Sequence, residues 1–162
     1  MLSDGTITLT PFRIEDAPTL MEIDRDPDAA RWFDFPAMTL DEAQHRRHAE
    51  GVIRTWWIET RDRVRFPFAI RVDDQAIGTV ELRTIDDTTA AMSYALIANE
   101  RGRGYATRAV RLLASTAFAR FGFERVEIHT HPDNVASQQV ASRAGFVREG
   151  TTTDEVLYSL TR

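Results

Sequence analysis

The chain has 162 residues, a net charge of −5 and no cysteine. This length fits one domain over residues 1–162 with a sizeable core. The missing cysteines exclude disulfides, thiolate catalysis and Cys-based zinc sites, and the acidic balance argues against non-specific nucleic-acid binding. No apolar run approaches the ~20 residues of a membrane span, and residues 1–5 lack the layout of a signal peptide. We therefore expect a cytoplasmic protein without nucleic-acid or membrane partners.

The N-terminal part of the chain predicts one strand followed by two helices. Threonines alternate with apolar residues over 6–10, which is typical of a strand. Asp16 is expected to cap a short helix. Thr39 and Glu42 have the spacing of a capping box, which predicts a second helix that reaches about Trp57.

Three strands of an antiparallel meander come next. Their predicted ranges are 66–72, 76–85 and 90–97, separated by turns rich in aspartate. Gly78 lies inside the second of these strands, where a glycine indicates a bulge or a close approach of another backbone.

The C-terminal part predicts a different pattern. An apolar stripe predicts a helix over 105–121 that ends at Gly122. A strand near 126–129, a helix from Asp133 to Gly145 and strands from 146 and over 155–160 follow. The crossover around residues 92–130 should place its two strands parallel in one sheet. The predicted class is α+β, with a mixed, mostly antiparallel sheet of seven strands and about four helices.

The most informative segment is the glycine-rich, cationic run Arg101-Gly102-Arg103-Gly104-Tyr105-Ala106-Thr107, between a strand and a helix. Backbone N–H groups and the dipole at a helix start favour anions. Gly102 and Gly104 let the backbone approach a phosphate closely, and the arginines add positive charge. The run therefore predicts a phosphate-binding loop.

Arg101-x-x-Gly104-x-Ala106 resembles the acyl-CoA-binding signature of the GNAT superfamily of N-acetyltransferases. The likeness includes the preceding strand, and continues through Asn134-Val135-Ala136-Ser137 and Ala144-Gly145-Phe146. The run 131–137 and the final 156–160 are similar to the branch of the ribosomal-protein-alanine N-acetyltransferases. The ordered set is specific, whereas the hexapeptide alone is a weak signal.

The resemblance implies the GNAT fold and an enzyme with acetyl-CoA as co-substrate. Loop amides would bind its pyrophosphate, a strand edge would pair with its pantetheine amides, and Asn134 would contact CoA while capping its helix. No metal is expected, because His45 and His48 lack a third ligand. The predicted acetyl-CoA-binding residues are Leu96, Ile97, Ala98, Arg101, Gly102, Arg103, Gly104, Tyr105, Ala106, Thr107, Asn134 and Ser137.

The resemblance also implies two catalytic side chains. Ser137, one turn into its helix, would protonate the departing CoA thiolate; a first-turn serine with a solvated hydroxyl is the alternative. An amine acceptor must lose a proton before it attacks, and Glu81 matches the family's carboxylate base, acting directly or through water. An ordinary exposed strand glutamate is the alternative for Glu81.

The acceptor is expected to bind near the aromatic segments around the first two helices. Trp32 and Phe33, with Tyr94 on the fourth strand, are the predicted substrate-binding residues. Tyr94, and at least one of Trp56 and Trp57, could instead fill the core.

The connection over residues 150–155 is shorter than the hairpin of ribosomal-type enzymes. It would leave the cleft more open, and it weakens the case for a peptide acceptor.

We expect acetyl transfer to a primary amine, either a protein N-terminus or a small amine such as a polyamine, amino acid or aminoglycoside. A non-catalytic acyl-CoA-binding module remains an alternative. Family members often pair, so a homodimer is an option, although no stripe in the sequence requires one.

Overall fold

The computed structural model describes residues 1–33 and 40–162, which form an eight-stranded mixed sheet. The strand order is β1-β2-β3-β4-β5-β6-β8-β7, and only β5 and β6 pair in parallel. The strands are β1 (Leu2–Ser3), β2 (Thr8–Thr10), β3 (Arg65–Val72), β4 (Gln75–Thr84), β5 (Thr89–Leu96), β6 (Arg125–Thr130), β7 (Val147–Thr151) and β8 (Val156–Thr161). The predicted α+β class is confirmed, with one more strand than expected because Leu2–Ser3 pairs with β2.

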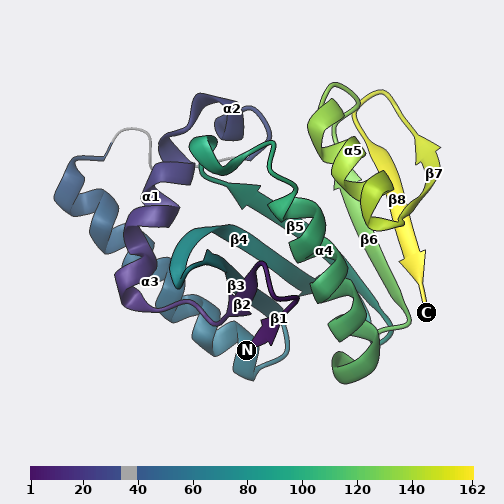
Figure 1. Cartoon of the computed structure of the whole chain (residues 1–162), viewed down its shortest axis with the longest axis horizontal. Coiled ribbons are helices and arrows are strands. Elements are labelled where there is room, and N and C mark those ends of the chain that lie inside the picture. The colour runs from purple at the N-terminus through teal and green to yellow at the C-terminus, as the bar shows by residue number, and fades with distance from the viewer. Residues whose placement is uncertain (34–39) are drawn as a thin grey trace.

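Helices cover both faces of this sheet (Figure 1). They are α1 (Ala17–Arg25), α2 (Pro27–Ala30), α3 (Glu42–Arg61), α4 (Tyr105–Thr116) and α5 (Val135–Ala144). A π-helical turn at Ala117–Phe121 continues α4 as far as Gly122, whose φ of +84° lies in the left-handed region. The predicted helix over 105–121 is therefore present, with a looser last turn.

The pleat of β3 divides the core in two. Ile70 belongs to a large cluster that includes α4, whereas its neighbour Ala69 belongs to a smaller cluster with α1 and α3. Since successive side chains of a strand point to opposite faces, α4 covers one face and α1 with α3 the other. Helix α5 packs beside α4 and contacts β6, β7 and β8.

The start of α3 differs from the prediction. Asp41 is the N-cap: its carboxylate accepts from the Gln44 N–H at 2.8 Å, and the Gln44 side chain accepts from the Asp41 N–H at 3.0 Å. Thr39, the predicted cap, lies outside the described residues, and Glu42 is the first residue of the helix. A capping box is thus present two residues later, and α3 continues one turn beyond Trp57.

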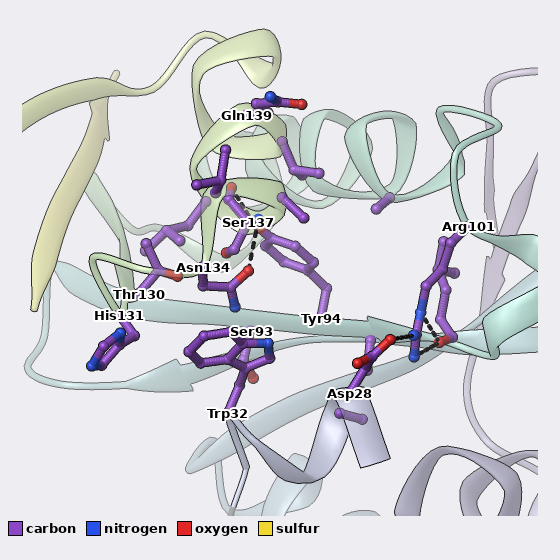
Figure 2. A pocket seen from close by; sticks show the side chains of 18 of the residues that line it. Asp28, Trp32, Ser93, Tyr94, Arg101, Thr130, His131, Asn134, Ser137 and Gln139 are labelled. Atoms are coloured by element: carbon purple, nitrogen blue, oxygen red, sulfur yellow. Dashed lines mark hydrogen bonds and ion pairs between the residues drawn. The ribbon is translucent and has the colours of Figure 1, made fainter. Parts of the chain in front are cut away.

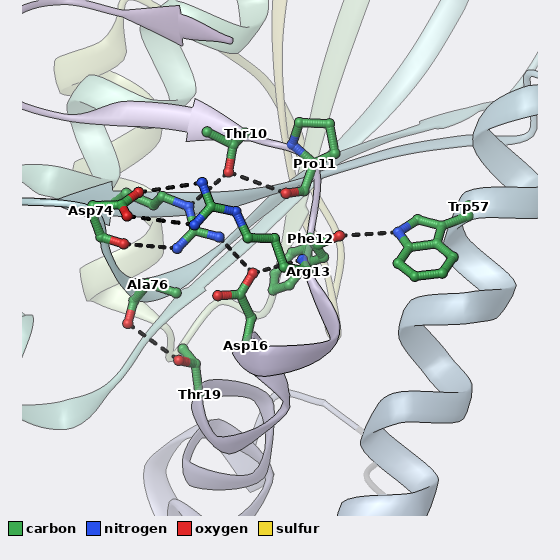
Figure 3. A network of polar contacts seen from close by, with 10 residues as sticks. Thr10, Pro11, Phe12, Arg13, Asp16, Thr19, Trp57, Asp74 and Ala76 are labelled. Atoms are coloured by element: carbon green, nitrogen blue, oxygen red, sulfur yellow. Dashed lines mark hydrogen bonds and ion pairs between the residues drawn. The ribbon is translucent and has the colours of Figure 1, made fainter.

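Asp16 does not cap α1 with its side chain. Its carboxylate instead accepts from the Arg13 N–H at 2.8 Å and forms a buried ion pair with Arg71 on β3 at 2.6 Å (Figure 3). Arg71 also donates to Thr10 on β2 and to the backbone oxygen of Asp74. The network joins the start of α1 to β2, β3 and the turn before β4. Asp16 is therefore the N-cap of α1 by position, as predicted, but its carboxylate serves this network in place of a capping hydrogen bond.

The junction between β5 and β6 is short. Only Thr89–Ala91 pair with Arg125–Glu127, and beyond them the two strands diverge. In Figure 1, β6, β8, β7 and α5 stand to the right of β5, across this divergence. On the opposite edge of β5, Gly78 confirms the predicted close approach, because a Cβ there would lie 2.3 Å from the Ala95 oxygen. The register of β3 and β4 also shifts beside Gly78.

Candidate active site

The glycine-rich loop forms the start of α4. Gly102 and Gly104 have φ of +76° and +82°, and Gly104 is the N-cap of the helix. Within residues 1–33 and 40–162 no side chain caps α4, so its first N–H groups can bind an outside acceptor. A Cβ on either glycine would meet no protein atom within 4 Å. Internal packing therefore does not require glycine at these two positions. The positive φ angles favour glycine, and the missing side chains leave the loop backbone open to a ligand.

The loop arginines are engaged within the protein. Arg101 donates to the Leu96 oxygen at 3.0 and 3.1 Å and pairs with Asp26, the N-cap of α2. Arg103 pairs with Glu100 at 3.3 Å, and Arg108 pairs with Asp4 at 2.9 Å. These carboxylates offset the positive charge, so the anion site depends chiefly on backbone N–H groups and the helix dipole.

A cavity of about 800 Å³ extends from this loop along the divergence of β5 and β6. Met92 to Leu96 line it from β5, beyond the last pair with β6. Of the predicted acetyl-CoA residues, those that line it are Leu96, Arg101, Gly102, Gly104, Tyr105, Ala106, Thr107, Asn134 and Ser137. Arg103 is not among the lining residues, the Ile97 N–H donates to Ile77, and Ala98 lines a second, smaller hollow.

Two hydroxyl groups meet across the divergence (Figure 2). Asn134 caps α5 as predicted, because its side chain accepts from the Ser137 N–H at 3.1 Å. The Tyr94 hydroxyl lies 2.9 Å from Ser137 Oγ and 3.0 Å from the Ser137 carbonyl oxygen. Burial raises the pKa of Tyr94 to about 12, so the phenol keeps its proton at neutral pH. Tyr94 lines the cavity and also packs against the core.

Glu81 is placed behind the cavity wall. It is opposite Ser93 in the β4–β5 register, and the Ser93 hydroxyl donates to Glu81 Oε1 at 3.0 Å. Ser93 lines the cavity and Glu81 does not. Burial raises the pKa of Glu81. Two groups partly offset this increase: the Arg65 guanidinium, which lies 3.6 Å from Oε2, and the Ser93 hydroxyl. Glu81 is thus not an ordinary exposed strand residue, since only 16% of its side chain is accessible.

Aromatic rings from the two halves of the chain meet at the end of the cavity that is remote from the glycine-rich loop, where the amine acceptor is predicted to bind. Trp32, which follows α2, lies 5.5 Å from His131, which follows β6, measured between ring centroids (Figure 2). Trp32 and Phe33, the predicted substrate-binding residues, line the cavity. Trp56 packs on Phe12, and Trp57 donates to the Phe12 oxygen, so neither reaches the cavity.

Carboxylates and a histidine complete this end. Asp154 and Glu155, from the connection before β8, line the cavity with His129 of β6. His129 lies 2.9 Å from Glu127 and 3.1 Å from Glu155. Burial lowers the pKa of His129, but the hydrogen bonds to Glu127 and Glu155 outweigh burial and raise it. The cluster therefore favours a charged imidazole between two carboxylates.

Comparison with known proteins identifies the family. A family model described as an acetyltransferase (GNAT) domain matches residues 6–147. The chain belongs to the GNAT family. A GNAT relative, "Probable N-acetyltransferase YjcK" of Bacillus subtilis (strain 168), is 32% identical over 162 residues, covering 93% of this chain and 85% of that protein.

Solved structures show the same GNAT fold. The Microcin C7 self-immunity acetyltransferase MccE, in complex with acetyl-CoA and AMP, aligns with a TM-score of 0.85 and 23% identity, covering 98% of this chain and 94% of that chain. RimL, a ribosomal L7/L12 alpha-N-protein acetyltransferase in complex with coenzyme A, aligns with a TM-score of 0.84 and 18% identity, covering 99% and 96%. The GNAT chain described here is an acyltransferase with acetyl-CoA as co-substrate.

Several lining residues were absent from the sequence prediction. Of these residues, Ser93 could have been predicted most readily from the sequence. Two antiparallel strands that turn at residues 86–87 must bring Glu81 opposite a residue near position 93. Asp154 and Glu155 gave no comparable signal, since their place depends on where β8 lies in the sheet.

No described helix is long and apolar enough to cross a membrane.

Proposed function

We propose that this GNAT enzyme transfers the acetyl group of acetyl-CoA to the primary amine of a peptide or protein N-terminus. The observation that carries this acceptor is the open end of the cavity. His129 and Glu155 line it, yet their side chains are 37% and 49% accessible. An extended chain could leave the site over them, and the acidic Asp154 and Glu155 would attract an ammonium group.

The donor would lie along β5 with its pyrophosphate at the start of α4. Backbone N–H groups from Gly104 onward would bind the phosphate oxygens, and the unpaired part of β5 would bind the pantetheine amides as an added strand does. Amides of β5 would polarise the thioester carbonyl. These contacts supply binding and orientation, which bring the amine and thioester together.

The proton transfers are assigned to Ser137 and Glu81. Ser137 Oγ would protonate the CoA sulfur as the C–S bond breaks, with the Tyr94 hydroxyl 2.9 Å away to hold it in position. Glu81 would act as base for the amine, because its raised pKa makes it a better proton acceptor than an ordinary glutamate.

A panel assay tests this proposal. CoA release is measured with N-terminal peptides, polyamines, amino acids and aminoglycosides, and mass spectrometry locates the acetyl group. We expect acetylation of peptide N-termini. Ser137→Ala and Glu81→Gln should each lower kcat by about a hundredfold, and Glu81→Gln, which lies outside the cavity lining, should leave acetyl-CoA affinity unchanged. Binding of acetyl-CoA without turnover of any peptide would contradict the acceptor assignment.

A small-molecule amine is the second candidate, and one contact favours it. Trp32 and His131 both line the cavity with their ring centroids 5.5 Å apart, and two rings so close would limit the size of an acceptor bound between the two halves of the chain. MccE, which shares the fold, was solved in complex with acetyl-CoA and AMP. Turnover of free amines in the panel, with none of peptides, would favour this candidate.

A further inference from the structure

Ser93 lies between the largely buried Glu81 carboxylate and the cavity. The two residues are direct partners in the β4–β5 register. The Ser93 hydroxyl is 3.0 Å from Glu81 Oε1, and only Ser93 lines the cavity. An acceptor amine in the cavity would therefore reach the serine hydroxyl before it could reach the carboxylate.

Ser93 and Tyr94 serve opposite sides of the same strand. Successive strand residues point to opposite faces, and in Figure 2 Tyr94 points toward Ser137 of α5 while Ser93 lies on the side of Trp32. One hydroxyl thus lies on the side where the CoA sulfur would depart. The other lies on the side of the aromatic acceptor wall, where the amine would arrive.

The two oxygens of Glu81 have different partners. Oε2 lies 3.6 Å from Arg65, which itself approaches Glu59 at 3.5 Å. Oε1 accepts from Ser93. Oε1 is therefore the oxygen that connects to the cavity, and the Ser93 hydroxyl makes the connection. A proton from the cavity could reach Glu81 in two transfers, first to Ser93 Oγ and then to Oε1.

We propose that Ser93 is a catalytic relay: its hydroxyl takes a proton from the acceptor ammonium as it passes its own proton to Glu81 Oε1. This inference rests on the proposed transfer to a primary amine. The neutral amine then attacks the thioester carbon, the N–C bond forms and the C–S bond breaks. Ser137 gives its proton to the sulfur and regains one from the acylated nitrogen. Glu81 releases the first proton to water, and Ser93 ends unchanged without being acylated.

The test compares Ser93→Ala, Ser93→Thr and Glu81→Gln in steady-state kinetics across pH with the amine found in the panel. For Ser93→Ala we expect kcat to fall about a hundredfold, with acetyl-CoA affinity and acceptor KM within about twofold of the wild type. Ser93→Thr retains a hydroxyl and should recover most of the rate. The double variant Ser93→Ala/Glu81→Gln should be no slower than either single variant, because both changes break one pathway.

The pH profile separates a relay from a structural contact. Activity of the wild type should fall as pH drops through the raised pKa of Glu81, because a protonated carboxyl cannot accept the proton. This acidic limb should vanish in both Ser93→Ala and Glu81→Gln. Thr79→Val is the matched control, since Thr79 lies two residues from Glu81 on the same face of β4 and outside the cavity lining.

Each result has a distinct meaning. Unchanged kcat in Ser93→Ala, or losses that multiply in the double variant, would overturn the relay while leaving amine acetylation intact. Absence of turnover by the wild type with every amine would overturn the proposed function, and the relay with it.

Discussion

The two ends of the cavity, which we propose bind the acetyl donor and the amine acceptor, differ in the groups that line them. At the donor end, the start of α4 and the unpaired edge of β5 offer backbone groups, and the nearby arginines are paired with carboxylates. At the acceptor end, side chains from three separate segments meet: Trp32, His131 and the Asp154–Glu155 connection. A backbone site depends on local conformation, whereas a side-chain site depends on how distant segments pack. The first can therefore remain constant in a family while the second changes with the substrate.

The largest effect is expected from the Asp16–Arg71 ion pair, which joins the start of α1 to β3. Asp16→Ala leaves Arg71 charged and buried, with only 3% of its side chain accessible. Loss of one partner of a buried pair costs about 3–5 kcal/mol, so the Tm should fall markedly in thermal unfolding. Asp74→Asn is the control, because it removes only the exposed pair with Arg13, which should matter by less than about 1 kcal/mol, while asparagine tolerates the φ of +63° at this position. Equal losses in the two variants would contradict this assignment.

The next effect tests the backbone nature of the donor end. Gly104→Val places a β-branched side chain at a φ of +82° on the surface of the loop. We expect acetyl-CoA affinity to fall at least a hundredfold, or about 3 kcal/mol, by calorimetry. Gly122→Val has a similar φ of +84° outside the cavity lining and controls for backbone strain. Intact binding by a folded Gly104→Val protein would refute the phosphate loop.

A smaller and more selective effect is expected from the acceptor wall. Trp32→Ala should raise acceptor KM by about tenfold, or about 1.4 kcal/mol, and leave acetyl-CoA affinity unchanged. Trp57→Ala removes an indole of the same size outside the cavity and should leave acceptor KM unchanged. A matching loss of acetyl-CoA affinity in Trp32→Ala would show that the two ends are not separable.

The smallest effect concerns charge. Glu155→Gln should raise the KM of a cationic acceptor by about threefold, because exposed charges contribute less than about 1 kcal/mol. It should also lower the pKa of His129, which Glu155 helps to raise, in an NMR titration. Asp87→Asn, an exposed change at a distant turn, is the control, and an unmoved His129 titration would contradict the cluster.

The contrast between local backbone features and side chains that packing brings together also explains which parts of the structure the sequence predicts. Most strands and helices followed from apolar periodicity, and the loop followed from its glycines, because both are local properties. The cap of α3 was assigned two residues early, since Thr39–Glu42 and Asp41–Gln44 are equally good boxes by spacing. For Asp16 the sequence predicts the position at the start of α1 but not the ion pair, because the buried partner, Arg71, is 55 residues away in the chain.

The acceptor side was less predictable for the same physical reason. Trp32 and Phe33 were found because aromatic residues cluster there in the sequence. His129 and Glu155 meet only because β6 and β8 pair side by side, and no local pattern encodes that meeting. Ser93 was within reach, but its relevance depends on Glu81 being buried behind it.

The three-pair junction of β5 and β6 has a mechanical consequence. Beyond Ala91, β5 and β6 separate and leave a gap in the sheet. The Tyr94–Ser137 contact bridges this gap on one side, and Trp32 and His131 bridge it on the other. A pantetheine arm bound in the gap would act as the missing strand and stiffen the sheet. Acetyl-CoA would then be a temporary part of the framework as well as a reactant, and we expect an ordered mechanism in which it binds before the amine.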